Sequence, residues 1–170
     1  APVLLGQGIP FVHAGADILR SKSMDRNSYN SGDWFNRIDW TMQSNEFGMG
    51  LPVAGVNQDN WYLMTPLLSN PAIAPQPSDI QMATGMLQEY YQIRYSSPLF
   101  RLQTAEEVEN RLTFYNNGPD QLPGLIVMGL SDAADPDLDA ARDQIVVLFN
   151  ANDEPQTFTD ASFTGMELAL

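Results

Sequence analysis

The side chains best suited to chemistry lie between His13 and Trp40, above all in the loop of residues 20–37. This loop lacks helix and strand periodicity, and a long irregular loop in a compact domain is usually functional or disordered. Disordered segments are poor in aromatic residues, whereas this loop mixes rings with polar groups. Its members are Arg20, Lys22, Asp25, Arg26, Asn27, Asn30, Asp33, Asn36 and Arg37, with the rings of Tyr29, Trp34 and Phe35. The pattern fits two structures: a sugar-binding surface, or an ordered loop packed on its own aromatics.

Other catalytic constellations are missing from the sequence. The chain has one histidine and no cysteine, which excludes an H-E-x-x-H zinc site, disulfides and thiol chemistry. No G-x-S-x-G nucleophile motif is present. His13 follows an apolar run, and a satisfied buried histidine is favoured there over a ligand-facing one. Four aspartates could supply a carboxylate pair for glycoside hydrolysis, although caps and turns are the commoner use of such residues. They are Asp17, Asp25, Asp33 and Asp39.

Composition and charge exclude several partner classes. The net charge of −13 would repel phosphate backbones and anionic membrane surfaces, so we expect neither a nucleic-acid nor a membrane partner. Neutral ligands such as sugars are not penalised. An apolar content of 44% predicts a globular core, and no apolar run approaches the ~18 residues of a membrane helix. The chain begins with A-P-V-L-L-G rather than Met, and we expect it to be a piece of a larger protein.

An acidic run joins two predicted strands. It contains Asp132, Asp135, Asp137, Asp139 and Asp143. The alternation at 135, 137 and 139 is typical of calcium loops, but the glycine and terminal glutamate of an EF-hand loop are missing. We therefore expect a solvated acidic loop rather than a metal site.

The elements of the first hundred residues are a strand, the long loop and a helix. Residues 8–13 form an apolar run that predicts a buried strand. Residues 57–68 could hold one short helical turn. Apolar positions spaced by three and four predict a helix over residues 78–95, with Ser78 and Gln81 as its capping box. Pro98 ends that helix.

The sequence pattern changes near residue 100, from a long loop and a helix to a series of strand-like runs. Thr104 and Glu107 match a second capping box, which predicts a short helix at most. Four runs rich in apolar and β-branched residues then predict antiparallel strands. They cover residues 111–115, 125–130, 144–149 and 163–170. We therefore divide the chain into residues 1–100 and residues 101–170.

Several long motifs resemble one known family, the pullulanase and limit-dextrinase group of starch-debranching enzymes in the α-amylase superfamily. The likeness covers nearly the whole chain. It is carried by G-I-P-F-V-H-A-G at 8–15, L-R-S-K-S at 19–23, N-S-Y-N-S-G-D-W-F-N at 27–36, Gly50-Leu51-Pro52, Asn60-Trp61, I-R-Y-S-S-P-L-F-R-L at 93–102, P-G-L-I-V-M-G at 123–129 and V-V-L-F-N at 146–150.

The resemblance implies an α/β fold joined to an all-β one. Residues 1–100 would be the end of a (β/α)₈ barrel: strand eight at 7–13, its substrate loop, and helix eight at 78–95. Residues 101–170 would begin an antiparallel C-terminal β-sandwich domain. Barrel active sites lie in the loops that follow the strands, which would place the loop of residues 20–37 in the substrate cleft.

The resemblance also implies roles for individual residues. The substrate-binding positions would be Arg20, Asp25, Asn27, Tyr29, Asn30, Asp33 and Trp34. The family's catalytic carboxylates follow strands four, five and seven, so they would precede residue 1. Partners would be an α-glucan, either a branched maltooligosaccharide or pullulan, and the upstream part of the same polypeptide, with cleavage of α-1,6 links by a retaining two-carboxylate mechanism. This chain alone would then be inactive and hold no cofactor, although the parent protein could bind calcium.

Two alternatives stay open at this point: a freestanding carbohydrate-binding module, and a purely structural domain whose loop pairs Asp25 with Arg26 or Lys22. The acid-rich, lysine-poor composition favours a secreted or cell-surface bacterial enzyme.

Overall fold

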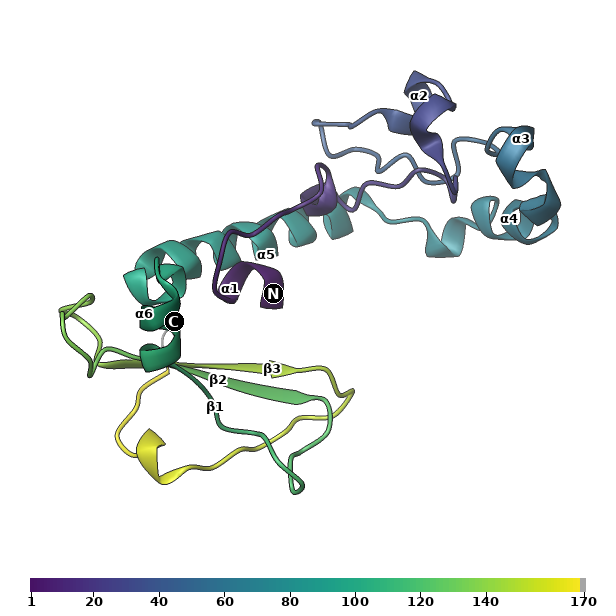
Figure 1. The fold of residues 1–170 in the computed structure, drawn as a ribbon. Helices are drawn as coiled ribbons and strands as arrows, with labels where there is room; N and C mark the ends of the chain where they lie inside the picture. The colour runs from purple at the N-terminus through teal and green to yellow at the C-terminus, as the bar shows by residue number, and fades with distance from the viewer. Residues whose placement is uncertain (169–170) are drawn as a thin grey trace. The chain divides into compact units, whose positions relative to one another are not determined.

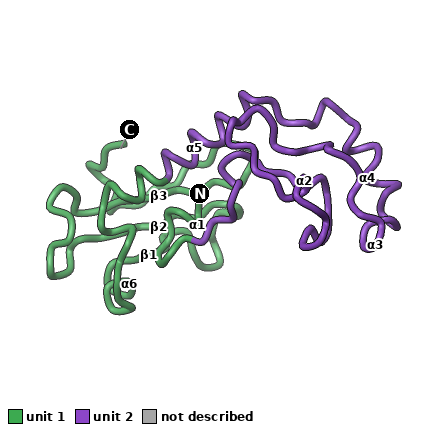
Figure 2. Tube along the Cα trace, turned by 90° about the horizontal axis from the view of Figure 1, so that it is seen from above, with its two compact units in different colours: residues 1–10, 91–170 green, residues 11–90 purple. Residues whose placement is uncertain are grey.

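The computed structural model describes residues 1–168 and divides into two compact units (Figures 1 and 2). One unit holds residues 1–10 and the chain from residue 91 onward, and the other holds residues 11–90. Helix α5, Pro77–Ser96, contributes residues to both.

The helices of the residue 11–90 unit are short. Beside the first part of α5 they are α2 (Asp33–Asn36), α3 (Ala54–Asn57), α4 (Trp61–Leu68) and the 3₁₀ turns Ala16–Ile18, Ser28–Asn30, Gln58–Asn60 and Pro71–Ile73. The polypeptide between residues 58 and 68 is thus more helical than the single turn expected. Residues 47–53, which lead into α3, form irregular chain. None of the helices described is long and apolar enough to cross a membrane.

The other unit is built around a three-stranded antiparallel sheet with β2 at its centre (Figure 1). Its elements are α1 (Pro2–Leu5), a 3₁₀ turn at Pro98–Arg101, α6 (Ala105–Arg111), β1 (Leu112–Phe114), β2 (Leu125–Ser131), β3 (Gln144–Asn150) and a 3₁₀ turn at Ala161–Phe163. Leu112 pairs with Leu130, and Leu125 pairs with Asn150. These three predicted strands are confirmed, and the central strand carries the fully buried Val127 and Leu130.

The predicted cap of α6 is confirmed. Thr104 Oγ1 accepts from the Glu107 N–H at 3.1 Å, and Glu107 Oε2 accepts from the Thr104 N–H at 3.1 Å. These reciprocal bonds satisfy donors that a helix start leaves free. Hydrogen bonds from the backbone N–H groups of Gln103 and Thr104 lower the pKa of the Glu107 carboxyl.

Helix α5 is confirmed with a different cap. It begins at Pro77, and Asp79 Oδ2 accepts from the Gln76 N–H at 2.8 Å, so Asp79 rather than Ser78 supplies the capping oxygen. Proline suits this first position because its missing N–H would have no helical partner. On the predicted face, Ile80 is fully buried and Arg94 is 5% exposed, whereas Ala83, Leu87 and Tyr90 are only half-buried.

The predicted strand over residues 8–13 is not formed. These residues form irregular chain with a bend at Gly8 and pair with no strand of the described chain, and Ile9 and Phe11 are 97% and 93% exposed. A strand needs ladder partners for its backbone groups, and residues 1–168 supply none here. The fourth predicted strand is also wrong over residues 163–168, where a 3₁₀ turn leads into irregular chain, and its last two positions lie outside the described residues.

Residues 1–8 are held by a buried arginine. Arg94 Nη1 donates to the carbonyl oxygens of Leu4 and Gly6, both at 2.8 Å, and Nη2 donates to that of Gly8 at 2.5 Å. The Gln7 side chain donates to Leu99 O at 2.7 Å and accepts from the Leu102 N–H at 3.1 Å. Burial, and then the charge of Arg101, lower the pKa of Arg94.

The acidic run differs from the solvated loop expected. The Asp132 side chain is only 3% exposed and pairs with Arg111, and it accepts from the N–H groups of Leu138 and Asp139. Asp139 in turn pairs with Arg142 at 3.4 Å. Part of the run is therefore internal structure, because backbone N–H groups and arginines bind its carboxylates.

Candidate functional site

The loop of residues 20–37 is ordered by polar contacts within the residue 11–90 unit. Lys22 Nζ donates to Ser28 Oγ at 2.6 Å, and Asn36 Nδ2 donates to Ser28 O at 2.8 Å. The Ser21 N–H donates to Asn45 O at 2.7 Å, which ties the start of the loop to a later segment. The loop is therefore a defined surface on which its exposed side chains are held in place.

Arg20 holds main chain in this structure. Its guanidinium donates to Ala14 O at 3.3 Å and also to Asn36 O. Its stem packs so closely on Gly15 that a Cβ there would lie 2.6 Å from Arg20 Cδ. Gly15 also has a φ of +90°, a conformation that glycine adopts without strain. Arg20 thus fixes the entry and exit of the loop.

Asp25 is partly buried and links the loop to α3. Its Oδ1 accepts from Asn57 Nδ2 at 2.9 Å and from the Asn27 N–H at 3.1 Å. Burial alone would raise the pKa of Asp25, but hydrogen bonds from Ser31, Asn27 and Asn57 and the charge of Lys22 together lower it. Asp25 is therefore a carboxylate that organises the loop, and within the described residues it forms no ion pair with Arg26 or Lys22.

Four predicted site residues project from this framework. Asn27, Tyr29, Asn30 and Asp33 are exposed, and Tyr29 is 93% exposed. Asn30 ends a 3₁₀ turn and Asp33 begins α2. A phenol ring, amides and a carboxylate are thus available to meet a polar ligand.

Trp34 and Phe35 form an aromatic pair with unequal exposure. Their ring centroids are 3.9 Å apart, and Phe35 is 2% exposed whereas Trp34 is 43% exposed. A Cβ on Gly50 would lie 3.0 Å from the Trp34 ring, so this glycine allows the ring to pack on the backbone. Phe35 anchors the loop, and Trp34 keeps part of its ring exposed.

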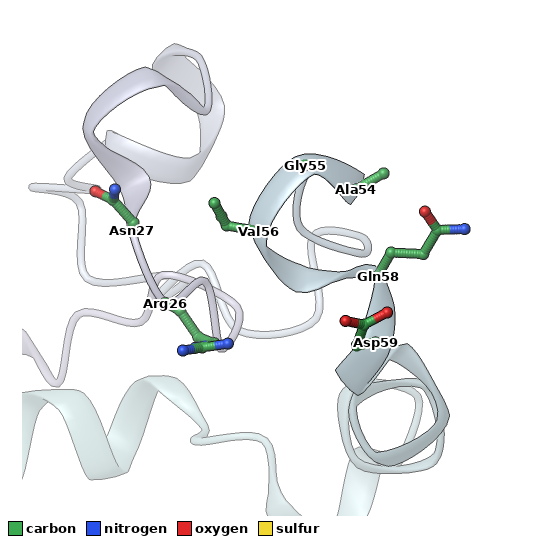
Figure 3. Close-up of a pocket in the computed structure, with 7 residues that line it drawn as sticks. All are labelled: Arg26, Asn27, Ala54, Gly55, Val56, Gln58 and Asp59. Atoms are coloured by element: carbon green, nitrogen blue, oxygen red, sulfur yellow. The ribbon is translucent and has the colours of Figure 1, made fainter.

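Part of the loop lines an open hollow of about 650 Å³ (Figure 3). Figure 3 shows Arg26 and Asn27 on one segment and residues 54–59 on another. The lining residues are Arg26, Asn27, Ala54, Gly55, Val56, Gln58 and Asp59. Its wall thus combines a guanidinium, two side-chain amides, a carboxylate and a small apolar patch.

The hollow includes only one of the seven predicted positions, Asn27. Gln58 and Asp59 were missed, although the polar run N-Q-D-N at 57–60 ahead of an apolar helix was a visible signal. That run was interpreted as the start of the helical segment rather than as a surface facing the loop. Folding brings it opposite Arg26 and Asn27.

Two further titratable residues of the residue 11–90 unit, His13 and Glu46, differ in exposure. His13 is exposed, so the prediction of a buried histidine is wrong. Glu46 is 1% exposed and pairs with Arg37 at 2.6 Å, with its second carboxylate oxygen buried and unpartnered. Within residues 1–168, no three histidine or acidic side chains are grouped as a metal ion would require.

Comparison with known proteins identifies relatives of the whole chain. The sequence model of the C-terminal region of pullulanase-type alpha-1,6-glucosidases matches residues 42–170. Pullulanase 1, chloroplastic, from Arabidopsis thaliana is 44% identical over 99% of this chain and 18% of its own length. Pullulanase from Klebsiella pneumoniae is 40% identical over 100% of this chain and 16% of its own length.

Solved structures give the same result. The maltotriose complex of PulA from Klebsiella pneumoniae matches 87% of this chain and 16% of its own, with a TM-score of 0.79 and 40% identity. Ligand-free PulA from the same organism matches 93% of this chain and 15% of its own, with a TM-score of 0.85 and 40% identity. The chain therefore spans less than a fifth of the relatives it matches.

Proposed function

This chain belongs to the pullulanase-type α-1,6-glucosidase family, and we propose that it is the C-terminal portion of a starch-debranching hydrolase that cleaves α-1,6 links. The observation that carries this proposal is the whole-chain likeness to pullulanases. Among them is a Klebsiella pneumoniae protein, 40% identical, whose structure holds maltotriose. The substrate would be an α-glucan that contains α-1,6 links, such as pullulan or a limit dextrin.

We propose that the loop of residues 20–37 forms one wall of the substrate cleft. Tyr29, Asn30 and Asp33 are exposed on an ordered framework, and Trp34 shows part of its ring, which suits the hydroxyls and the apolar face of a glucose unit. Asn27 adds an amide in the hollow. Arg20 and Asp25 would support this surface rather than contact the sugar. Their polar atoms form hydrogen bonds with the main chain and with Asn57.

The catalytic carboxylates would come from the part of the polypeptide that precedes residue 1. Two of the four aspartates considered for catalysis have structural roles: Asp25 holds the loop, and Asp39 accepts from the N–H groups of Thr41 and Ser44, both at 2.9 Å. Hydrogen bonds from the Thr41 side chain and backbone lower the pKa of Asp39, which suits a turn and not a proton donor. A retaining mechanism needs two carboxyl groups about 5–5.5 Å apart, one of them able to donate a proton.

The proposed fold is the end of a (β/α)₈ barrel over residues 1–100, followed by the start of a β-sandwich domain over residues 101–170. Ile9 and Phe11, almost fully exposed, support this assignment because they would be covered if neighbouring barrel strands paired with residues 8–13. The loop after that strand would then open at the catalytic end of the barrel. The antiparallel β1–β2–β3 sheet supports the second part.

Activity measurements on two proteins test the proposed function. The full-length protein that contains this chain should release reducing ends from pullulan, and the 170-residue chain alone should not. Pullulan hydrolysis by the isolated chain would overturn the assignment of the carboxylates to the preceding part. Maltotriose binding by the isolated chain without any activity of the full-length protein would instead favour a carbohydrate-binding module.

A further inference from the structure

We propose that Asn57 is a positioning residue that sets the spacing between the two walls of the hollow and thereby its affinity for an α-glucan chain. The inference rests on the proposed function, because it assigns the hollow to the substrate cleft. Asn57 itself is 0% exposed, so it cannot touch a sugar and must act through its neighbours.

The Asn57 amide bonds to both walls. Its Oδ1 accepts from the Arg26 N–H at 3.1 Å, and its Nδ2 donates to Asp25 Oδ1 at 2.9 Å. Nδ2 also donates to Val53 O at 3.0 Å, at the start of the turn that carries α3. One side chain therefore joins the loop to the segment opposite.

These bonds reach the residues that line the hollow. Arg26 is held directly through its backbone, and Asn27 is held through Asp25, whose Oδ1 also accepts from the Asn27 N–H at 3.1 Å. On the other wall, Val56 and Gln58 are the chain neighbours of Asn57. The separation of the walls is thus set by hydrogen bonds to a single amide.

The Asn57 position demands both a donor and an acceptor. The lowered pKa of Asp25 keeps that carboxyl ionised, so the group facing it must donate. The Arg26 N–H needs an acceptor from the same side chain. The substitution Asn57→Asp keeps the acceptor but places a second carboxylate against Asp25, which should push the loop away from α3.

The test uses the full-length protein and measures the dissociation constant of maltotriose by calorimetry. We expect Asn57→Asp to weaken binding about tenfold or more, because small displacements of positioning groups carry large penalties. The double variant D25N/N57D should recover at least about half of the lost binding free energy. In this variant the new amide at position 25 can donate to the new carboxylate at position 57. If N57D does not fold, Asn57→Ser removes the amide without adding a charge and carries the same expected loss.

Thr84→Val is the matched control. Thr84 is also buried, and its Oγ1 lies 3.0 Å from both Asp17 O and Ile80 O, but it belongs neither to the loop of residues 20–37 nor to the lining of the hollow. This substitution should lower the melting temperature while leaving maltotriose binding near the wild-type value. Equal losses of binding in N57D and T84V, or no recovery in D25N/N57D, would overturn the role of Asn57. A wild-type protein that binds no maltotriose would overturn the proposed function instead.

Discussion

Arg111 and Asp132 form an ion pair inside the sheet-containing unit, with 2% of the arginine side chain and 3% of the aspartate side chain exposed. The arginine also donates to Ala134 O and Pro136 O, both at 2.6 Å. It therefore holds one part of the segment that connects β2 to β3. The aspartate binds the other end of that segment through the N–H groups of Leu138 and Asp139.

Removing the cation of this pair should destabilise the protein strongly. Arg111→Met leaves a buried carboxylate without its partner, and such changes lower the free energy of unfolding by about 3–5 kcal/mol. Urea denaturation of the full-length protein measures the loss. Arg142→Met is the matched control, because the Arg142 side chain is 39% exposed, and its removal should cost less than about 1 kcal/mol. Equal losses from the two variants would contradict the prediction.

The same pair predicts how stability depends on pH. Burial would raise the pKa of Asp132, but hydrogen bonds from the Asp139 and Leu138 N–H groups and the charge of Arg111 together lower it. Because the pKa is lowered on folding, this stabilisation is complete above the ordinary aspartate value of 3.8 and is lost as the pH falls towards the lower folded value. The difference in unfolding free energy between the wild type and Asp132→Asn should shrink below that pH. A difference that stays constant from about pH 5 to about pH 2 would count against this account.

Asp33 should contribute to substrate binding without contributing to the fold. It is exposed at the start of α2, and its side chain forms no ion pair within the described residues. Losing a hydrogen bond to a charged group costs about 1.5–3 kcal/mol, so Asp33→Ala should lower kcat/KM for pullulan at least about tenfold. Its melting temperature should match the wild type. Asp120→Ala, at another exposed position, is the control, and an unchanged kcat/KM in D33A would remove Asp33 from the site.

Tyr29 should contribute to substrate binding through its aromatic ring rather than through its hydroxyl group. It is 93% exposed, and covering an aromatic ring with a ligand contributes on the order of 1–2 kcal/mol. Tyr29→Ala should therefore raise the KM for pullulan about tenfold, whereas Tyr29→Phe should stay within about threefold. Tyr62→Ala changes another exposed tyrosine, on α4, and should leave KM unchanged. A KM for Y29A equal to that for Y62A would show that the ring does not meet the substrate.

Arg94 should be important for stability because one guanidinium binds three carbonyl oxygens. Arg94→Met leaves these acceptors without a donor and should lower the free energy of unfolding by about 2–4 kcal/mol. Arg94→Lys should recover only part of the loss, since an ammonium group lacks the planar fork of arginine. Arg101→Met is the control: Arg101 lies over the Tyr95 ring at 4.9 Å, a contact worth about 1 kcal/mol. Full recovery by R94K would contradict the role given to the guanidinium fork.

Local sequence patterns were sufficient to predict the helices and strands whose formation depends on residues close together in the chain. The Thr104–Glu107 capping box, the long helix α5 and the three runs that became β1, β2 and β3 were all predicted near their observed bounds. Caps and periodicity act within a few residues, which is why they can be recognised without a structure. The motifs along the chain also indicate the family to which the chain belongs.

Long-range contacts decided the rest. The apolar run of residues 8–13 predicts a strand, but these residues have no ladder partner within the described chain. No local sequence pattern around Asn57 predicts the hydrogen bond from its side-chain amide to Asp25, because the two residues are 32 positions apart. The sequence by itself determined the chemistry available to the loop of residues 20–37. Only the tertiary structure decided which groups became framework and which stayed exposed, because burial and hydrogen-bond geometry are set by segments distant along the chain.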